Sequence, residues 1–222
     1  MNSRVPETSS LAPADAPGFT SSTAVKVVKV AVNSLFVIMF VWLATSSYLH
    51  FVGSGTLKSF GVLAVNTVFV ALYLAQRPAK SASTSLSAWL LAIGGSTVAM
   101  LMRPSDVPGF MGLANVVQIV GLTLLLTALL SLRRSFAVVA SNRGIRQGGL
   151  YRIVRHPLYM AEIIVLLGVL LANPTLANLA VWLCECALQF SRACTEERFL
   201  AADPVSRAYL SKVRYRLVPG IL

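Results

Sequence analysis

The segment Gly148-Gly-Leu-Tyr-Arg-Ile-Val-Arg-His-Pro-Leu-Tyr159 separates long apolar runs on its N-terminal side from a shorter apolar run that begins at Met160. Pro157 has no backbone N–H and a fixed φ, so it fits the first turn of a helix and interrupts a helix elsewhere. The segment therefore predicts a polar loop that ends where a new helix begins. Its paired glycines let the backbone approach a ligand closely, which makes the loop a candidate ligand site.

The composition is that of a membrane protein. The 222-residue chain is 56% hydrophobic and 12% charged, and its mean hydropathy is +0.72. Soluble domains carry about 25% charged residues, so these values indicate an integral membrane protein. The formal net charge of +11 is explained by basic residues retained on the cytoplasmic side, beside anionic lipid. The loops lack the interleaved aromatic residues of strand-binding surfaces, so we expect no nucleic-acid partner.

The apolar runs predict the helices. Four runs precede the polar loop, at about Val27–Tyr48, Phe60–Ala75, Leu86–Met102 and Phe110–Leu132. Two shorter runs, Met160–Leu171 and Thr175–Phe190, are separated by Asn173-Pro174 and predict a helical hairpin. We therefore expect an all-α integral membrane protein with about five to six transmembrane helices, including this short C-terminal hairpin. The expected division is a disordered cytoplasmic tail (1–24), four transmembrane helices (25–132) and a region of loop, hairpin and tail (133–222).

The distribution of basic residues predicts the orientation. With the N-terminus inside, the arginine-rich loop after the fourth helix and the C-terminal tail are also inside. Only Lys58 and Arg103 then lie in outside loops. The positive-inside rule therefore places both termini in the cytoplasm, and we expect the protein in a bacterial inner membrane.

One face of the last helix carries most of the polarity. Glu185, Gln189, Arg192 and Glu196 are spaced four, three and four residues apart, which places them on one side of an α-helix. Ionisable residues inside an apolar segment are costly and usually functional. Arg192 and Glu196 alone could form a structural ion pair, but the whole stripe favours a face that lines a site.

The helix that starts at Pro157 adds a second polar group. Its free amides and dipole favour a carboxylate or phosphate, and Tyr159 and Glu162 share one of its faces. His156 at the helix start is, taken alone, as readily a structural cap as a functional residue.

Metal and disulfide chemistry are not predicted. Cys184, Cys186 and Cys194 are odd in number and lie in or beside an apolar run, so we interpret them as small buried apolar side chains. No histidine or further cysteine nearby completes a zinc set. Motifs of serine hydrolases, zinc proteases and phosphate-binding loops are also missing from the sequence.

Three blocks of sequence resemble the isoprenylcysteine carboxyl methyltransferase family, which is related to the phospholipid methyltransferases. They are Arg143-Gly-Ile followed by Gly149-Leu-Tyr-Arg-Ile-Val-Arg-His-Pro-Leu-Tyr159, then Thr195-Glu-Glu-Arg-Phe-Leu200, then Val213-Arg-Tyr-Arg-Leu-Val-Pro-Gly220. The resemblance covers about residues 130–222, with the expected hairpin between the blocks.

The resemblance implies a membrane-embedded methyltransferase that uses S-adenosylmethionine as cofactor. By position, the cofactor contacts would be Arg143, Gly144, Ile145, Arg146, Tyr151, His156, Pro157, Leu158, Tyr159 and Glu196. Arg192 matches the substrate-side arginine of the family, so Arg192 and Glu196 are the expected catalytic residues. Glu162, Glu185 and Gln189 are expected beside Arg192 on the substrate side.

The acceptor is expected to be lipophilic or small and to enter from membrane lipid. The resemblance favours the carboxylate of an isoprenylcysteine-like substrate, which an arginine can orient without a general base. The alternatives are a phospholipid amine or a small thiol, for which Glu162, Glu185 or His156 would accept the proton, and a non-catalytic membrane scaffold or ligand binder. No obligate protein partner is expected.

Overall fold

The structure is a computed structural model, and it describes residues 23–75, 81–83, 85–132, 135–136, 141–142 and 147–221. Residues 1–22, which make up most of the predicted disordered tail, lie outside the described residues. The chain divides into two compact units, residues 1–36 and 37–222. The described part of the first unit is the beginning of helix α1, and the second unit holds all other elements.

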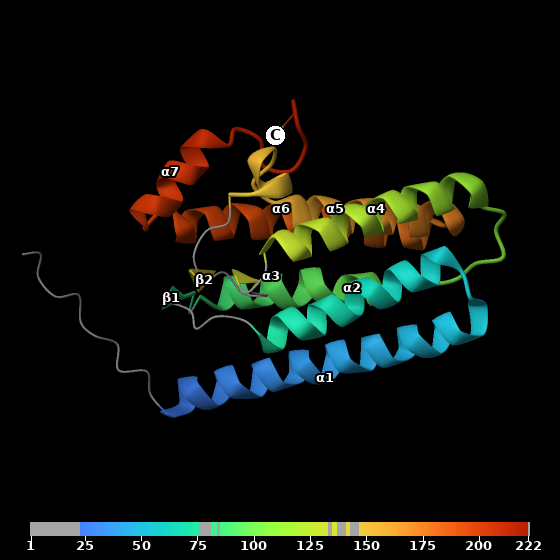
Figure 1. The fold of residues 1–222 in the computed structure, drawn as a ribbon, viewed down its shortest axis with the longest axis horizontal. Helices are drawn as coiled ribbons and strands as arrows, with labels where there is room; N and C mark the ends of the chain where they lie inside the picture. Colours follow the sequence, from blue (N-terminus) through green and yellow to red (C-terminus); the bar gives the residue numbers. More distant parts are fainter. Residues whose placement is uncertain are drawn as a thin grey trace, which may run out of the picture. The chain divides into compact units, whose positions relative to one another are not determined.

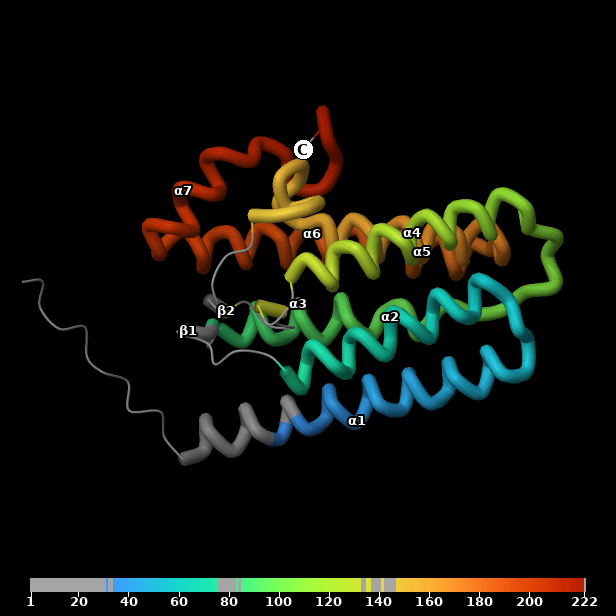
Figure 2. Tube along the Cα trace, in the orientation of Figure 1, coloured from blue at the N-terminus to red at the C-terminus, as the bar shows by residue number. Residues whose placement is uncertain are grey.

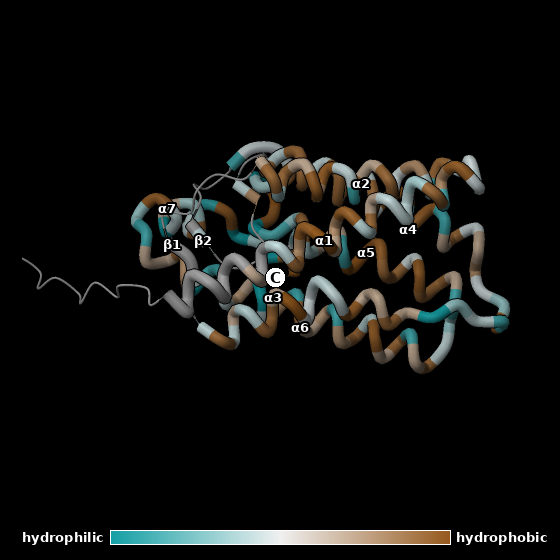
Figure 3. The backbone as a smooth tube through the Cα atoms, turned by 90° about the horizontal axis from the view of Figure 1, so that it is seen from below, coloured by the Kyte–Doolittle hydropathy of each residue, from teal (hydrophilic) through white to brown (hydrophobic). Residues whose placement is uncertain are grey.

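The four predicted helices before the polar loop are present. They are α1 (Thr23–Ser54), α2 (Leu57–Leu74), α3 (Leu86–Thr97), which continues as the 3-10 helix η1 (Val98–Leu101), and α4 (Met111–Leu132). Within the part of the chain that the structure describes, three helical stretches are long and apolar enough to cross a membrane: Ser34–Ser54, Leu57–Leu74 and Met111–Leu132. Figure 3 shows the apolar residues along these helices. The protein is an all-α membrane protein, as predicted.

The C-terminal hairpin is also confirmed, with one difference in length. Helix α5 (Pro157–Ala172) has 16 residues and α6 (Leu176–Leu200) has 25. At 1.5 Å per residue they measure about 24 Å and 37 Å. Helix α6 extends past the apolar run that ends at Phe190 and reaches Leu200, so Arg192 and Glu196 lie on this helix, as the predicted polar face requires. This continuation carries the acidic end of the predicted stripe.

The turn between α5 and α6 is fixed by one buried side chain. Asn178, which is 1% exposed, accepts a hydrogen bond from the backbone N–H of Arg103 at 3.0 Å and donates to the carbonyl oxygens of Arg103 and Asn173 at 2.9 and 2.8 Å. The Thr175 hydroxyl accepts from the Asn178 backbone N–H and caps α6. These bonds join the hairpin turn to the segment before α4.

Helix α5 packs most extensively against α4 and also against α6, while α2 packs on α4 and α3 on α6 (Figures 1 and 2). Two glycines permit the close approach of α4 and α5. A Cβ on Gly121 would lie 2.8 Å from the backbone N of Val165, and one on Gly168 would collide with the Gln118 side chain and lie 2.9 Å from its backbone N. Small residues at such contacts are typical of membrane helices.

Short elements connect the helices at the end where α5 begins. Strands β1 (Ser81–Ala82) and β2 (Ser141–Asn142) form one antiparallel pair with Ser81 opposite Asn142. The 3-10 helix η3 (Gly149–Arg152) follows, and Gly149 has a positive φ of 59°. After α6 come α7 (Pro204–Lys212) and a tail in which Tyr215 forms a parallel bridge with Val154. The start of α5, the end of α6 and the tail therefore meet at one end of the second unit (Figure 1).

Candidate functional site

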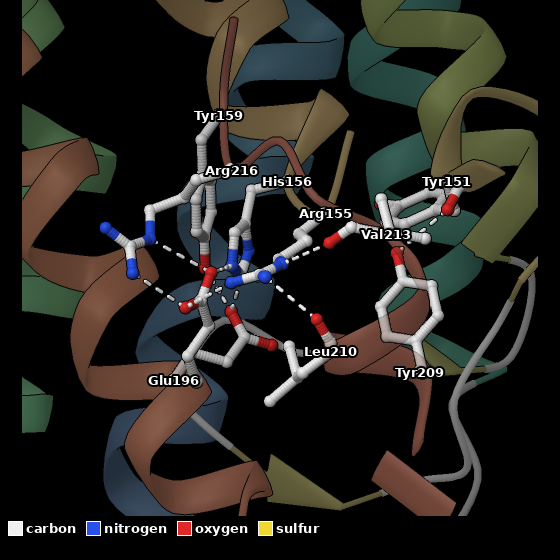
Figure 4. Close-up of polar contacts among 10 residues, drawn as sticks. Tyr151, Arg155, His156, Tyr159, Glu196, Tyr209, Leu210, Val213 and Arg216 are labelled. Carbon is white, nitrogen blue, oxygen red and sulfur yellow. Dashed lines mark hydrogen bonds and ion pairs between the residues drawn. The ribbon is translucent and has the colours of Figure 1, made fainter. Parts of the chain in front are cut away.

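The carboxylate of Glu197 is the centre of an ion-pair cluster at that end. Arg155 Nη1 donates to its Oε2 at 3.0 Å, and Arg216 donates to both oxygens, at 3.0 and 2.9 Å. His156 Nε2 lies 3.1 Å from Glu197 Oε1. Figure 4 shows the side chains of Arg155, His156 and Arg216 converging. Glu197 was not among the predicted site residues.

The neighbouring basic groups determine the pKa of Glu197. Burial acts to raise the pKa of Glu197, but the hydrogen bonds from His156 and Arg216 and the charges of His156 and Arg155 outweigh it and lower the pKa to about 2. The hydrogen bond to Glu197 in turn raises the pKa of Arg216. Glu197 is therefore ionised at any ordinary pH and serves as a structural anion.

Arg155 also fastens the C-terminal tail to the start of α5. Its Nε donates to the Val213 carbonyl at 2.6 Å and its Nη2 to the Leu210 carbonyl at 2.8 Å. The backbone N–H groups of Arg155 and His156 donate to the carbonyls of Tyr215 and Arg216 at 2.9 and 3.0 Å. The tail is thus held by side-chain and backbone bonds together.

Tyr151 is buried beneath α7. The Tyr209 hydroxyl donates to its carbonyl oxygen at 2.9 Å (Figure 4). Burial raises the pKa of both phenols, with nearby carboxylates adding to the effect at Tyr151. Both tyrosines therefore stay neutral. The backbone carbonyl of Tyr151 is bound by another residue of the protein, Tyr209.

The predicted residues Tyr159, His156, Glu196 and Arg192 do come together. The Tyr159 hydroxyl donates to Glu196 Oε2 at 2.8 Å. The His156 ring is stacked on the Tyr159 ring with centroids 5.4 Å apart, and the Arg192 guanidinium carbon lies 4.6 Å from the Tyr159 centroid. The Glu196 side chain is 28% exposed, so it can still contact a ligand. Tyr159 thus contacts both Glu196, through its hydroxyl, and Arg192, through its ring.

The membrane-side part of the stripe forms a second polar cluster. Gln189 Nε2 donates to Glu162 Oε2 and to Glu185 Oε1, each at 2.6 Å, and Arg192 Nη1 donates to Gln189 Oε1 at 3.0 Å. Glu185 and Gln189 are 1% and 0% exposed. Their position on one helical face was predicted, and Glu162 of α5, which was expected beside them, contacts Gln189 in the same cluster.

A cavity of about 180 Å³ adjoins this cluster. Its polar wall includes Glu162, Glu185 and Arg192, and Leu158 also lines it. The remaining wall is largely apolar and comprises Phe40, Leu43, Phe69, Ala99, Leu125, Phe136, Val165 and Leu166, with Asn66, Gly95 and Ser96. A much smaller recess on the other side of Arg192 is lined by Tyr159, Thr195 and Glu196 together with α3 residues. Arg192 therefore lies between two spaces.

The other predicted residues divide into three groups. Arg143, Gly144, Ile145 and Arg146 lie outside the described residues. Pro157 is fully buried at the first position of α5, where it starts the helix. The cysteines are free, but the expectation that they are buried is wrong for Cys184, which is exposed; it faces outward on a helix whose surroundings are lipid. Among the described residues no three metal-binding side chains gather.

Sequence reasoning missed Glu197 and its partners for a geometric reason. Successive helical residues are about 100° apart, so Glu197 does not share the face of Glu196. The available signal was the doublet Glu196-Glu197 followed by the basic block of the tail.

Residues 113–202 match the model of the family described as Isoprenylcysteine carboxyl methyltransferase (ICMT) family. A search of curated proteins finds no match. The matched range runs from α4 past the end of α6, so it includes Tyr159, Arg192 and Glu196.

Proposed function

We propose that this chain, whose residues 113–202 match the isoprenylcysteine carboxyl methyltransferase family, is a membrane methyltransferase of that family and transfers a methyl group from S-adenosylmethionine to a lipophilic acceptor. The observation that carries the proposal is the convergence, inside the matched range, of Tyr159 from α5 with Arg192 and Glu196 from α6. The cavity beside Arg192 supplies a place for an acceptor that arrives from the membrane.

The residues present suit the proposed cofactor. S-adenosylmethionine carries a sulfonium cation, an ammonium, a carboxylate and ribose hydroxyls. Glu196, which is partly exposed, is an acceptor for the ammonium or the hydroxyls. Among the described residues no side chain caps the start of α5, so its amides suit the carboxylate. The predicted contacts at Tyr151, His156, Leu158 and residues 143–146 remain predictions.

When bound, the cofactor supplies a methyl group that its sulfonium already activates. The protein therefore has to hold the acceptor in line with that methyl and exclude water. The apolar lining of the cavity excludes water, and Arg192, fixed between Tyr159 and Gln189, sets the boundary between acceptor and cofactor. The isoprenylcysteine-like carboxylate and the cytoplasmic position of the site stay predictions.

Calorimetric titration with S-adenosylhomocysteine in detergent tests this proposal. We expect saturable binding to the wild-type protein and at least about tenfold weaker binding to Glu196→Ala, because a charged hydrogen bond contributes about 1.5–3 kcal/mol. Asp106→Ala, which removes an exposed carboxylate outside the cluster, is the matched control and should bind like wild type. No binding to wild type at millimolar ligand would show that the chain is a scaffold or binder of another kind.

A further inference from the structure

One oxygen of the buried Glu185 carboxylate lacks a partner. Glu185 Oε1 accepts from Gln189, whereas Oε2 is buried and has no hydrogen-bond partner among the described residues. A buried charged atom without a hydrogen bond is strongly destabilising. Because Glu185 lines the 180 Å³ cavity, the missing donor has to come from whatever occupies that cavity.

The amide donors of Gln189 are already used. The amide nitrogen of Gln189 has two hydrogens, yet it lies 2.6 Å from an oxygen of Glu162, 2.6 Å from an oxygen of Glu185 and 3.3 Å from the Gly95 carbonyl. The two carboxylates therefore share a single amide group.

The charges of the cavity wall point to a cation. Two carboxylates, Glu162 and Glu185, face one guanidinium, Arg192, among the described lining residues. In a membrane-embedded setting, a further negative charge beside these carboxyl groups is expensive. An acceptor carboxylate would add such a charge, whereas an ammonium supplies the donor that Glu185 Oε2 lacks.

Resting on the proposed function, we propose that the methyl acceptor is a lipophilic amine whose ammonium group binds Glu185 and Glu162. The cavity volume corresponds to about six water-sized groups, enough for the amine and the first carbons. Phe40, Leu43 and Leu125 line the remainder and suit an alkyl chain that continues into the bilayer. Arg192 is then a positioning residue that offsets the carboxylate charge.

The same carboxylate can prepare the amine for reaction. An ammonium has no lone pair, so it first gives a proton to Glu185 Oε2 and becomes a neutral amine. The nitrogen lone pair then forms the N–C bond to the methyl group, and the C–S bond of the sulfonium donor breaks with its electron pair remaining on sulfur. The product is an N-methylated ammonium and a neutral sulfide, and Glu185 returns its proton to solvent after release.

A binding experiment tests the acceptor class. The probes are n-octylamine, octanoate and octanol, which share one chain and differ in the head group, titrated into the protein in nanodiscs. We expect octylamine to bind wild type more tightly than octanoate or octanol, and at least about tenfold more weakly to Glu185→Gln. Asp106→Asn removes a carboxylate charge outside the cavity and should leave octylamine affinity unchanged. Equal affinity for octanoate, or an unchanged affinity in Glu185→Gln, would overturn the proposal.

Methyl transfer is measured on the same preparations. The two measurements together distinguish a failure of the proposed methyltransferase function from a failure of the proposed amine acceptor. With methyl-labelled S-adenosylmethionine, label should enter octylamine and not octanoate. If octylamine binds in a Glu185-dependent manner but S-adenosylhomocysteine does not bind, the proposed function fails and the amine site stands. If S-adenosylhomocysteine binds and label enters octanoate, or enters octanol in preference to octylamine, the amine assignment fails and the methyltransferase stands.

Discussion

At the scale of single residues, Glu197 and Glu196 are neighbours with different roles. Glu197 is held by Arg155, His156 and Arg216, and its side chain is 10% exposed. Glu196 has Tyr159 as a hydrogen-bond partner and is 28% exposed. The first therefore maintains the site, and the second is available to a ligand.

Glu197 gives a pH-dependent stability. Because its pKa of about 2 lies below the unfolded value of about 4.3, its contribution is fully present above about pH 5 and is lost as the pH falls towards 2. By linkage, this contribution is about 2–3 kcal/mol near neutral pH. We expect Glu197→Gln to melt at a lower temperature than wild type at pH 7, and the gap to narrow at pH 3.5 in detergent. A gap that is constant with pH would contradict this assignment.

Gly95 tests the position of Arg192 without changing the arginine. A Cβ at Gly95 would lie 2.8 Å from Arg192 Cδ and 3.0 Å from its Nη1, whereas one at Gly94 would make ordinary contacts of 3.5 Å with Leu188. Gly95→Ala should displace the guanidinium, and displacements of about 1 Å can lower turnover by about a hundredfold. We expect a loss of at least tenfold in turnover with little loss of stability.

Gly94→Ala is the neighbouring control for this measurement and should keep near wild-type turnover. If both variants lose turnover alike, the effect belongs to α3 as a whole and not to Arg192.

At the scale of elements, the α4–α5 contact positions the start of α5 and with it Tyr159. Gly168→Ala should destabilise the protein by about 1–3 kcal/mol, because a backbone atom and the Gln118 side chain fill the space beside it. Gly112→Ala in the same pair of helices has nothing within 4 Å of its added Cβ and should be neutral or slightly stabilising. Thermal unfolding in detergent measures both, and equal effects would show that the close approach is not important.

The helices could be predicted from sequence because their signals are local. Apolar runs located α1 to α4, and Asn173-Pro174 located the hairpin turn. The spacing of Glu185, Gln189 and Arg192 placed them on one face, as observed. The end of α6 could not be predicted from hydrophobicity, because its last turns are polar and are held by contacts with α5 and the tail. Arg155 and Arg216 reach Glu197 from 42 and 19 residues away, and no periodicity encodes such contacts.

At the scale of the whole molecule, the two ends of the second unit differ in how many basic residues they carry. Lys58 and Arg103 lie near the end of the hairpin turn, and the exposed basic residues Arg152, Arg198, Arg207, Lys212 and Arg214 lie at the other end, beside the site. Apolar side chains such as Trp42, Leu49 and Val116 are exposed between the ends, as lipid-facing helices require. This separation supports the predicted cytoplasmic position of the site.

Cysteine labelling tests that orientation. In a protein whose three native cysteines are replaced by alanine, we expect a membrane-impermeant maleimide added to intact cells to label Asp106→Cys and not Ser211→Cys. Both positions are exposed, and both should react after the membrane is permeabilised. Labelling of Ser211→Cys alone in intact cells would invert the topology and place the site outside.

The bond between Glu197 and Arg216 also sets an order of assembly. Synthesis proceeds from the N-terminus, so the α5–α6 hairpin is made before Arg216, which follows Glu197 by 19 residues. In that interval the nascent chain can pair Glu197 with Arg155 and His156 but has no tail to close over them. The membrane helices are therefore made first and the tail that completes the ion-pair cluster around Glu197 last, and a stalled chain that ends after α6 would lack this part of the cluster.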